Sequence, residues 1–119
     1  MQGHRNLLSI HIPGTLAANV NWRWQAPFDC RLAHVSAVGS NANDASLSLG
    51  VSSDPDSILT ASAVGDSDVP AEYGRADWAG TNPSGRLNQG DILVATVDFD
   101  GAGGTAAQNL TVVLTLVEG

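Results

Sequence analysis

The side chains of this sequence that could act in catalysis or bind a metal are its histidines, its single cysteine and its paired aspartates. The histidines, His4, His11 and His34, follow no metal-ligand spacing, and none has a glutamate or cysteine beside it in a zinc pattern. The sequence has no G-x-S-x-G turn, no Walker loop and no glutamate pair at glycosidase-like spacing. We therefore predict that the chain is not an enzyme and binds no cofactor.

Three Asp-x-Asp pairs are the candidates for a metal site: Asp54 with Asp56, Asp66 with Asp68, and Asp98 with Asp100. Calcium takes six to eight oxygen ligands, and loops with paired carboxylates supply such oxygens. The stretch "DFDG" fails as a calcium-binding helix-loop-helix, because its twelfth position falls on Asn109 and its glycine comes too early. We interpret the pairs as turn caps and predict no metal, with calcium as the alternative.

The composition excludes several classes of partner. Only 14% of residues are charged, lysine is absent, and the net charge is −7. Nucleic acids and anionic membranes are bound through cationic side chains, so neither is an expected partner. The start of the chain resembles neither a signal peptide nor a membrane span. Cys30 is the only cysteine, which predicts a buried thiol and synthesis in a reducing cytoplasm.

Short segments with a period of two residues, separated by Gly, Pro, Asn and Asp, predict about eight strands. No segment has the pattern of an amphipathic helix of three turns. We expect one domain over residues 1–119, an all-β antiparallel β-sandwich with a jelly-roll-like order, and an immunoglobulin-like sandwich is the alternative. The expected strands cover residues 8–12, 19–26, 30–38, 45–51, 58–64, 74–80, 92–99 and 109–117.

Tryptophans 22 and 24 share one face of an expected strand. In a strand, alternate side chains point to the same side, so Val20 and Ala26 lie on the face of Trp22 and Trp24. We predict that this face belongs to the core. The alternative is an exposed platform that stacks on sugar rings.

The last strand has apolar residues on both faces. Leu110, Val112, Leu114 and Leu116 alternate with Thr111, Val113, Thr115 and Val117. This pattern is typical of a central strand or of a strand under a subunit contact. We predict that the second set forms a subunit or capsid contact. The other candidate contact residues are Arg5 near the N-terminus and Tyr73 and Trp78, which lie among loop-like residues and are expected to be exposed.

The ending "LNQGDILVATVDFDGAGGTAAQNLTVVLTL" resembles that of small β-sandwich proteins of tailed bacteriophages. The lysine-poor, aspartate-rich chain as a whole is similar to phage capsid decoration (cement) proteins. The resemblance implies a homotrimer that is made in the bacterial cytoplasm and binds the major capsid protein on the outer surface of the virion. It also implies an N-terminal arm, but only about six residues precede the first expected strand. The alternatives are a carbohydrate or host-surface binding module and, third, a small enzyme or ligand-binding sandwich.

Overall fold

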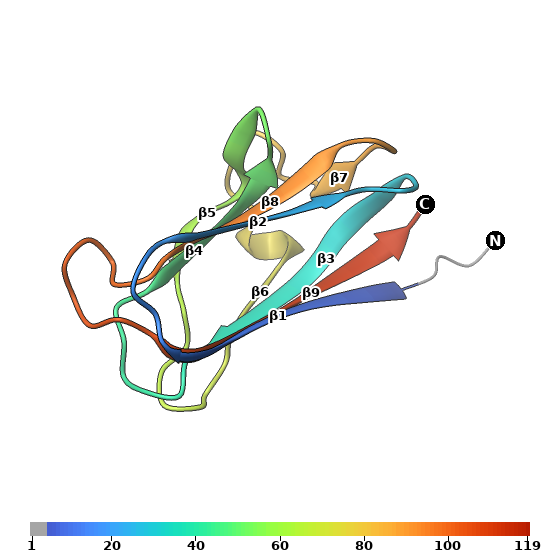
Figure 1. The fold of residues 1–119 in the computed structure, drawn as a ribbon. Helices are drawn as coiled ribbons and strands as arrows, with labels where there is room; N and C mark the ends of the chain where they lie inside the picture. The colour runs from blue at the N-terminus through green and yellow to red at the C-terminus, as the bar shows by residue number, and fades with distance from the viewer. Residues whose placement is uncertain (1–4) are drawn as a thin grey trace.

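Nine strands and one short 3-10 helix form the part of the chain that the structure describes (Figure 1). The structure is a computed structural model and describes residues 5–119. The elements are β1 (Arg5–Thr15), β2 (Val20–Gln25), β3 (Cys30–Val38), β4 (Ser46–Val51), β5 (Asp54–Ala63), β6 (Ala71–Gly74), η1 (Arg75–Asp77), β7 (Arg86–Leu87), β8 (Ile92–Asp98) and β9 (Gln108–Glu118).

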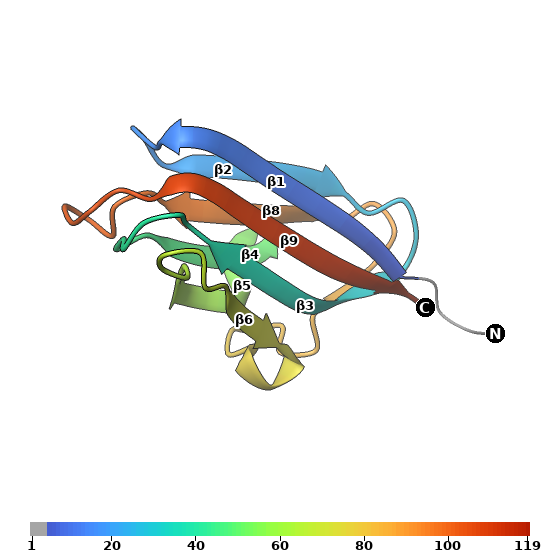
Figure 2. The same ribbon diagram turned by 90° about the horizontal axis from the view of Figure 1, so that it is seen from below.

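The strands form two antiparallel sheets that pack face to face. The first has the order β1-β9-β3-β6, with the two-residue β7 also paired to β3, and the second has the order β2-β8-β4-β5. Apart from β7, the connections pass from one sheet to the other except in the β4–β5 hairpin. The predicted all-β antiparallel sandwich is confirmed. Figure 2 shows β1 and β2 along one edge of the sandwich and β5 and β6 along the opposite edge.

One expected strand is wrong and two strands were missed. Within the expected strand 74–80, residues 75–80 form η1 and a loop, because the Asp77 carboxylate accepts a hydrogen bond from the Gly74 amide at 2.9 Å and the Trp78 amide donates one to the Arg75 carbonyl at 3.2 Å. These local bonds curl the backbone and compete with strand pairing. The first missed strand, β6, is four residues long and begins inside the polar connection before η1, and the second, β7, has only two residues.

Strand β9 lies in the middle of the first sheet, between β1 and β3. Its inward side chains, Leu110, Val112, Leu114 and Leu116, are fully buried. The facing central strand of the second sheet, β8, buries Leu93, Ala95 and Val97. The core is therefore a layer of aliphatic side chains between two sheets, as the alternation in both strands predicts.

Gly50 marks the closest approach between β4 and the start of β5. A Cβ atom there would lie 2.3 Å from the Asp54 carbonyl oxygen and 2.5 Å from the Pro55 carbonyl carbon. Both are backbone atoms, so the strand itself would have to move. Only a residue without a side chain fits at this position.

We expect Gly50→Ala to lower the free energy of unfolding by about 1–3 kcal/mol, the usual cost of overpacking. Gly74→Ala is the matched control, since the nearest atom to its Cβ would be the Ala33 carbonyl oxygen at 3.8 Å. Urea unfolding followed by circular dichroism measures both. Equal unfolding midpoints for the two variants would contradict the close approach.

Candidate interaction surfaces

The outward side chains of β9 lie in the middle of the first sheet's outer face. Thr111, Val113, Thr115 and Val117 are half-buried, because strands pair with β9 on both sides. The strand register places their neighbours beside them: Arg5 and Arg31 flank Val117, Leu7 and His34 flank Thr115, Ser9 and Ser36 flank Val113, and His11 and Val38 flank Thr111. We call this set of residues the β9 face. It joins five predicted contact residues, Arg5 included, in one surface.

Polar groups on the β9 face bond to one another across strands. The His11 Nδ1 lies 2.8 Å from the Thr111 hydroxyl. The His34 Nε2 lies 3.4 Å from a Glu72 carboxylate oxygen, and these side chains are 42% and 67% exposed. The apolar part of the face includes Leu7, which is 69% exposed. The face is thus a mixed apolar and polar surface, and His4 lies outside the described residues.

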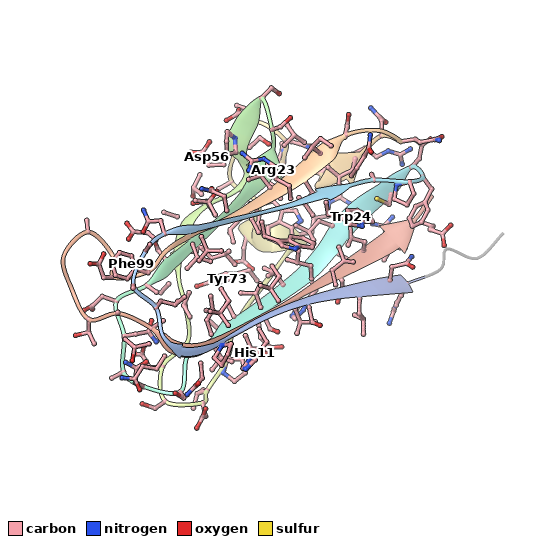
Figure 3. All side chains as sticks on the ribbon, in the orientation of Figure 1. His11, Arg23, Trp24, Asp56, Tyr73 and Phe99 are labelled. Carbon is pink, nitrogen blue, oxygen red and sulfur yellow. The ribbon has the colours of Figure 1, made fainter. Side chains whose placement is uncertain are left out.

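The inward side chains of β1 and β2 are only half-buried. They contact the core, yet each keeps part of its surface accessible: Leu8, Ile10 and Ile12 of β1, and Val20, Trp22 and Trp24 of β2. We call this strip the β1–β2 edge. In Figure 3, Trp24 points into the sandwich and Arg23 away from it. The Trp24 ring also meets the Phe28 ring edge-on, with centroids 6.4 Å apart.

The tryptophan pair is therefore neither a fully buried core nor an exposed platform. The predicted direction toward the core is confirmed, because Trp22 and Trp24 pack against it. Their burial is incomplete because β2 is the outermost strand of its sheet. Sequence alternation reports the direction of a side chain, but not whether its strand has a neighbour.

Tyr73 links the two sheets at the opposite edge of the sandwich. It lies on β6 of the first sheet and is half-buried, and its hydroxyl donates a 2.6 Å hydrogen bond to the Ala63 carbonyl on β5 of the second sheet. Burial, reinforced by the charge of Asp77, raises the pKa of Tyr73, so the hydroxyl remains a donor at neutral pH. We call this side of the molecule the β5–β6 edge.

The expectation that Trp78 is exposed is wrong. Trp78 is 4% exposed, and its indole N–H donates a 3.1 Å hydrogen bond to the Leu32 carbonyl. The segment after η1 folds inward over β3, so a residue in a loop-like stretch becomes part of the core. A buried tryptophan of this kind contributes no contact to a partner.

Aspartates of the Asp-x-Asp pairs accept hydrogen bonds from nearby groups. The Asp98 carboxylate accepts from the Gly101 amide at 3.1 Å, and Asp66 accepts from the Asn43 amide at 3.0 Å. Asp54 instead accepts from the Thr81 hydroxyl at 2.9 Å. Turn capping thus accounts for part of the aspartate pattern. Within residues 5–119, no group of three or more His, Cys, Asp or Glu is placed to hold a metal ion.

Cys30 is a buried free thiol, as predicted. Burial raises its pKa, so the thiol stays protonated at neutral pH and is a poor nucleophile. Among residues 5–119, no helix is long and apolar enough to cross a membrane.

Comparisons with known proteins find a shared fold. No protein-family model matches the chain, and no curated protein matches it. Among solved structures, a chain of the "Cyanophage Pam1 capsid asymmetric unit" is similar, with a TM-score of 0.55 and 12% sequence identity. The likeness covers 99% of this chain and 87% of that chain. It therefore extends over the whole sandwich.

We expect Trp78→Phe to lower the free energy of unfolding by about 1–3 kcal/mol, because the Leu32 carbonyl loses a buried donor. Trp22→Phe is the matched control, since the Trp22 indole makes no hydrogen bond within residues 5–119 and its site is half-open. Chemical denaturation of both variants gives the comparison. A smaller loss for Trp78→Phe than for Trp22→Phe would show that this hydrogen bond is unimportant.

We expect a chelator to leave the thermal unfolding midpoint unchanged, since Asp66 and Asp98 already have hydrogen-bond partners in the protein. Calorimetry with and without EDTA tests this expectation, with added calcium as the reverse control. A drop in melting temperature on chelation would assign calcium to one of the aspartate loops.

Proposed function

We propose that this chain is a non-enzymatic structural protein of a phage virion, a decoration protein that binds the outer surface of the capsid as a homotrimer. The observation that carries the proposal is the likeness in fold, over 99% of the chain, to a chain of a cyanophage capsid asymmetric unit. The sequence resemblance to decoration proteins, seen in the β8–β9 ending, supports the same class.

The surface chemistry supports an adhesive role. The chain has no lysine and few charged residues, so little side-chain entropy is lost when a neighbour covers it. The β9 face presents Leu7, Val113 and Val117 between polar groups, a mixture typical of non-obligate interfaces. We assign this face to contact with another subunit or with the shell. Contacts of this kind, repeated over a shell, resist the pressure of packaged DNA.

The net charge supports an outer location. At −7 the chain is repelled by phosphate, so a lining that faces packaged DNA is unfavourable. The partner that we propose is the major capsid protein, and neither nucleic acid nor membrane takes part.

The proposal assigns no chemical step to the chain. The thiol of Cys30 is buried and kept protonated, and the described histidines bond to neighbours on an open sheet face. Neither arrangement gives a base beside an activated nucleophile. We therefore place a small enzyme last among the candidate functions.

A carbohydrate or host-surface binding module is the second candidate. The observation that favours it is the half-open position of Trp22 and Trp24, because aromatic rings at a sheet edge stack on sugars. A glycan array with the wild type and Trp22→Phe distinguishes this candidate. Specific glycan binding that the variant loses would favour it over the capsid role.

The proposed function is tested with shells of the major capsid protein of the virion to which the proposal assigns this chain. We expect saturable co-sedimentation with the shells, and light scattering should give about three times the 12.2 kDa mass of one chain. Val113→Asp places a charge on the β9 face and should weaken association or shell binding by about tenfold or more.

Ser48→Asp is the matched control for Val113→Asp. It adds the same charge at a half-buried position on the outer face of the second sheet. Failure of the wild-type chain to bind shells at any concentration would refute the capsid role.

A further inference from the structure

Three of the five arginines of this chain form one row across the first sheet. Arg5 of β1 pairs with Val117 of β9, and Val117 pairs with Arg31 of β3. Arg31 also pairs with Arg86 of β7. Residues that lie directly opposite each other on neighbouring strands share one face of the sheet, so all three arginines are on the outer face. We call them the arginine row, and at about 4.8 Å per strand it spans about 14 Å.

The arginine row is open to a partner. All three side chains are exposed, and Figure 2 shows β1, β9 and β3 with no strand of the second sheet in front of them. Within residues 5–119, Arg5 and Arg31 form no ion pair. Arg86 has the Asp29 carboxylate 3.7 Å away and donates a hydrogen bond to the Gly119 carbonyl. The row therefore presents two guanidinium groups without a carboxylate and one that is partly neutralised.

The strands that carry the arginine row contain almost no acidic residues. Strands β1, β3, β7 and β9 include one, Glu118, and its register partner is the buried Cys30, so it belongs to the inward side. Glu72 of β6 does lie on the outer face, but it is level with Val113, four residues along β9 from Val117, and it contacts His34. The protein itself thus leaves the positive charge of the row largely unbalanced.

Two members of the row also repel each other. Arg31 and Arg86 are directly opposite, and like charges in this position destabilise a strand pair. Asp29 offsets this repulsion only from the side of Arg86. A negatively charged group placed over the row would remove the repulsion, so the arrangement favours an anionic partner.

The opposite end of the sandwich is acidic. The loops that join β3 to β4, β5 to β6 and β8 to β9 lie there, at the end away from the C-terminus (Figure 1). They contain no arginine, and with the last residue of β8 they carry five of the twelve acidic residues: Asp44, Asp66, Asp68, Asp98 and Asp100. We call this the aspartate end. Because charge is distributed in this way, an anionic surface attracts the arginine row and repels the aspartate end.

The apolar neighbours of the arginine row indicate a polypeptide as the partner. Val117 lies between Arg5 and Arg31, and Leu7, two residues along β1 from Arg5, is 69% exposed. A phosphate backbone has no apolar group to cover these side chains, and the net charge of −7 repels it. A polypeptide can offer carboxylates beside apolar side chains, and guanidinium groups bind carboxylates through paired hydrogen bonds.

We propose that the arginine row binds an acidic, partly apolar segment of a partner polypeptide, with the aspartate end directed away from that partner. This inference rests on the proposed function, under which the segment belongs to the shell protein. It names the chemistry of the contact on the β9 face and the orientation of the chain on the shell. Arg5 and Arg31 are about 10 Å apart across β9, so they bind carboxylates of different side chains.

Charge reversal in the arginine row tests this assignment. Arg5→Glu and Arg31→Glu should each weaken co-sedimentation with shells by about tenfold or more, because each sets a carboxylate against the acidic segment. An ionic strength of about 1 M, where the Debye length is about 3 Å, should weaken wild-type binding as well. Circular dichroism verifies that each variant is folded.

Arg23→Glu is the matched control for both variants. Arg23 is exposed on the outward side of β2 in the second sheet, so its reversal changes the net charge equally but lies away from the row. Asp68→Asn is the control for the aspartate end, and its positive φ of 65° suits asparagine as well. Both should leave shell binding within about twofold of the wild type. A loss with Arg23→Glu equal to that with Arg31→Glu would overturn the assignment.

A titration without shells separates this inference from the proposed function. Poly-L-glutamate added to the isotope-labelled chain should shift the NMR amide signals of the arginine row and leave those of the aspartate end unchanged. Shifts away from the row would overturn the inference, and so would tighter binding of duplex DNA than of poly-L-glutamate. If the wild type fails to bind shells but poly-L-glutamate shifts the row, the capsid role is overturned and the preference for an acidic polypeptide stands.

Discussion

Burial of an aliphatic layer between two sheets is the constraint on which the rest of this molecule depends. Leu110, Leu114 and Leu116 of β9 are completely buried, and β8 supplies the facing residues. Such a layer forms only if the strands alternate strictly and the loops satisfy their own backbone groups. Aspartates such as Asp66 and Asp98 do this by accepting hydrogen bonds from loop amides, which explains why acidity is concentrated in the turns.

A sandwich of two open sheets also has two edges, and this chain covers them unequally. Tyr73 and the buried Trp78 lie toward the β5–β6 edge and reinforce it through hydrogen bonds to Ala63 and Leu32. The β1–β2 edge has no comparable side-chain bridge between the sheets among the described residues. Its tryptophans pack against the core but are only partly buried.

The surfaces of this molecule, rather than a chemical centre, support the proposed function. The likeness to a capsid chain extends over the length of the sandwich, but at 12% identity it is a likeness of fold, and folds of this kind serve many functions. The additional weight comes from the β9 face, the apolar edge and the distribution of charge. Each of these is a property of the folded surface. Substitutions on these surfaces, followed by shell-binding and glycan-binding assays, distinguish an adhesive role from glycan binding.

The sequence by itself determined the fold class, most strand positions, the inward faces of β2 and β9, and the burial of Cys30. These follow from local alternation and turn residues, which act over a few neighbouring positions. Only the tertiary structure decided which strands are central and which are edges, because pairing partners are distant in sequence. That difference explains why Trp22 and Trp24 point inward but are only half-buried, since β2 is an edge strand. It also explains why Trp78, in a segment without alternation, is buried against β3, where its indole N–H donates a hydrogen bond to a carbonyl 46 residues earlier in the chain.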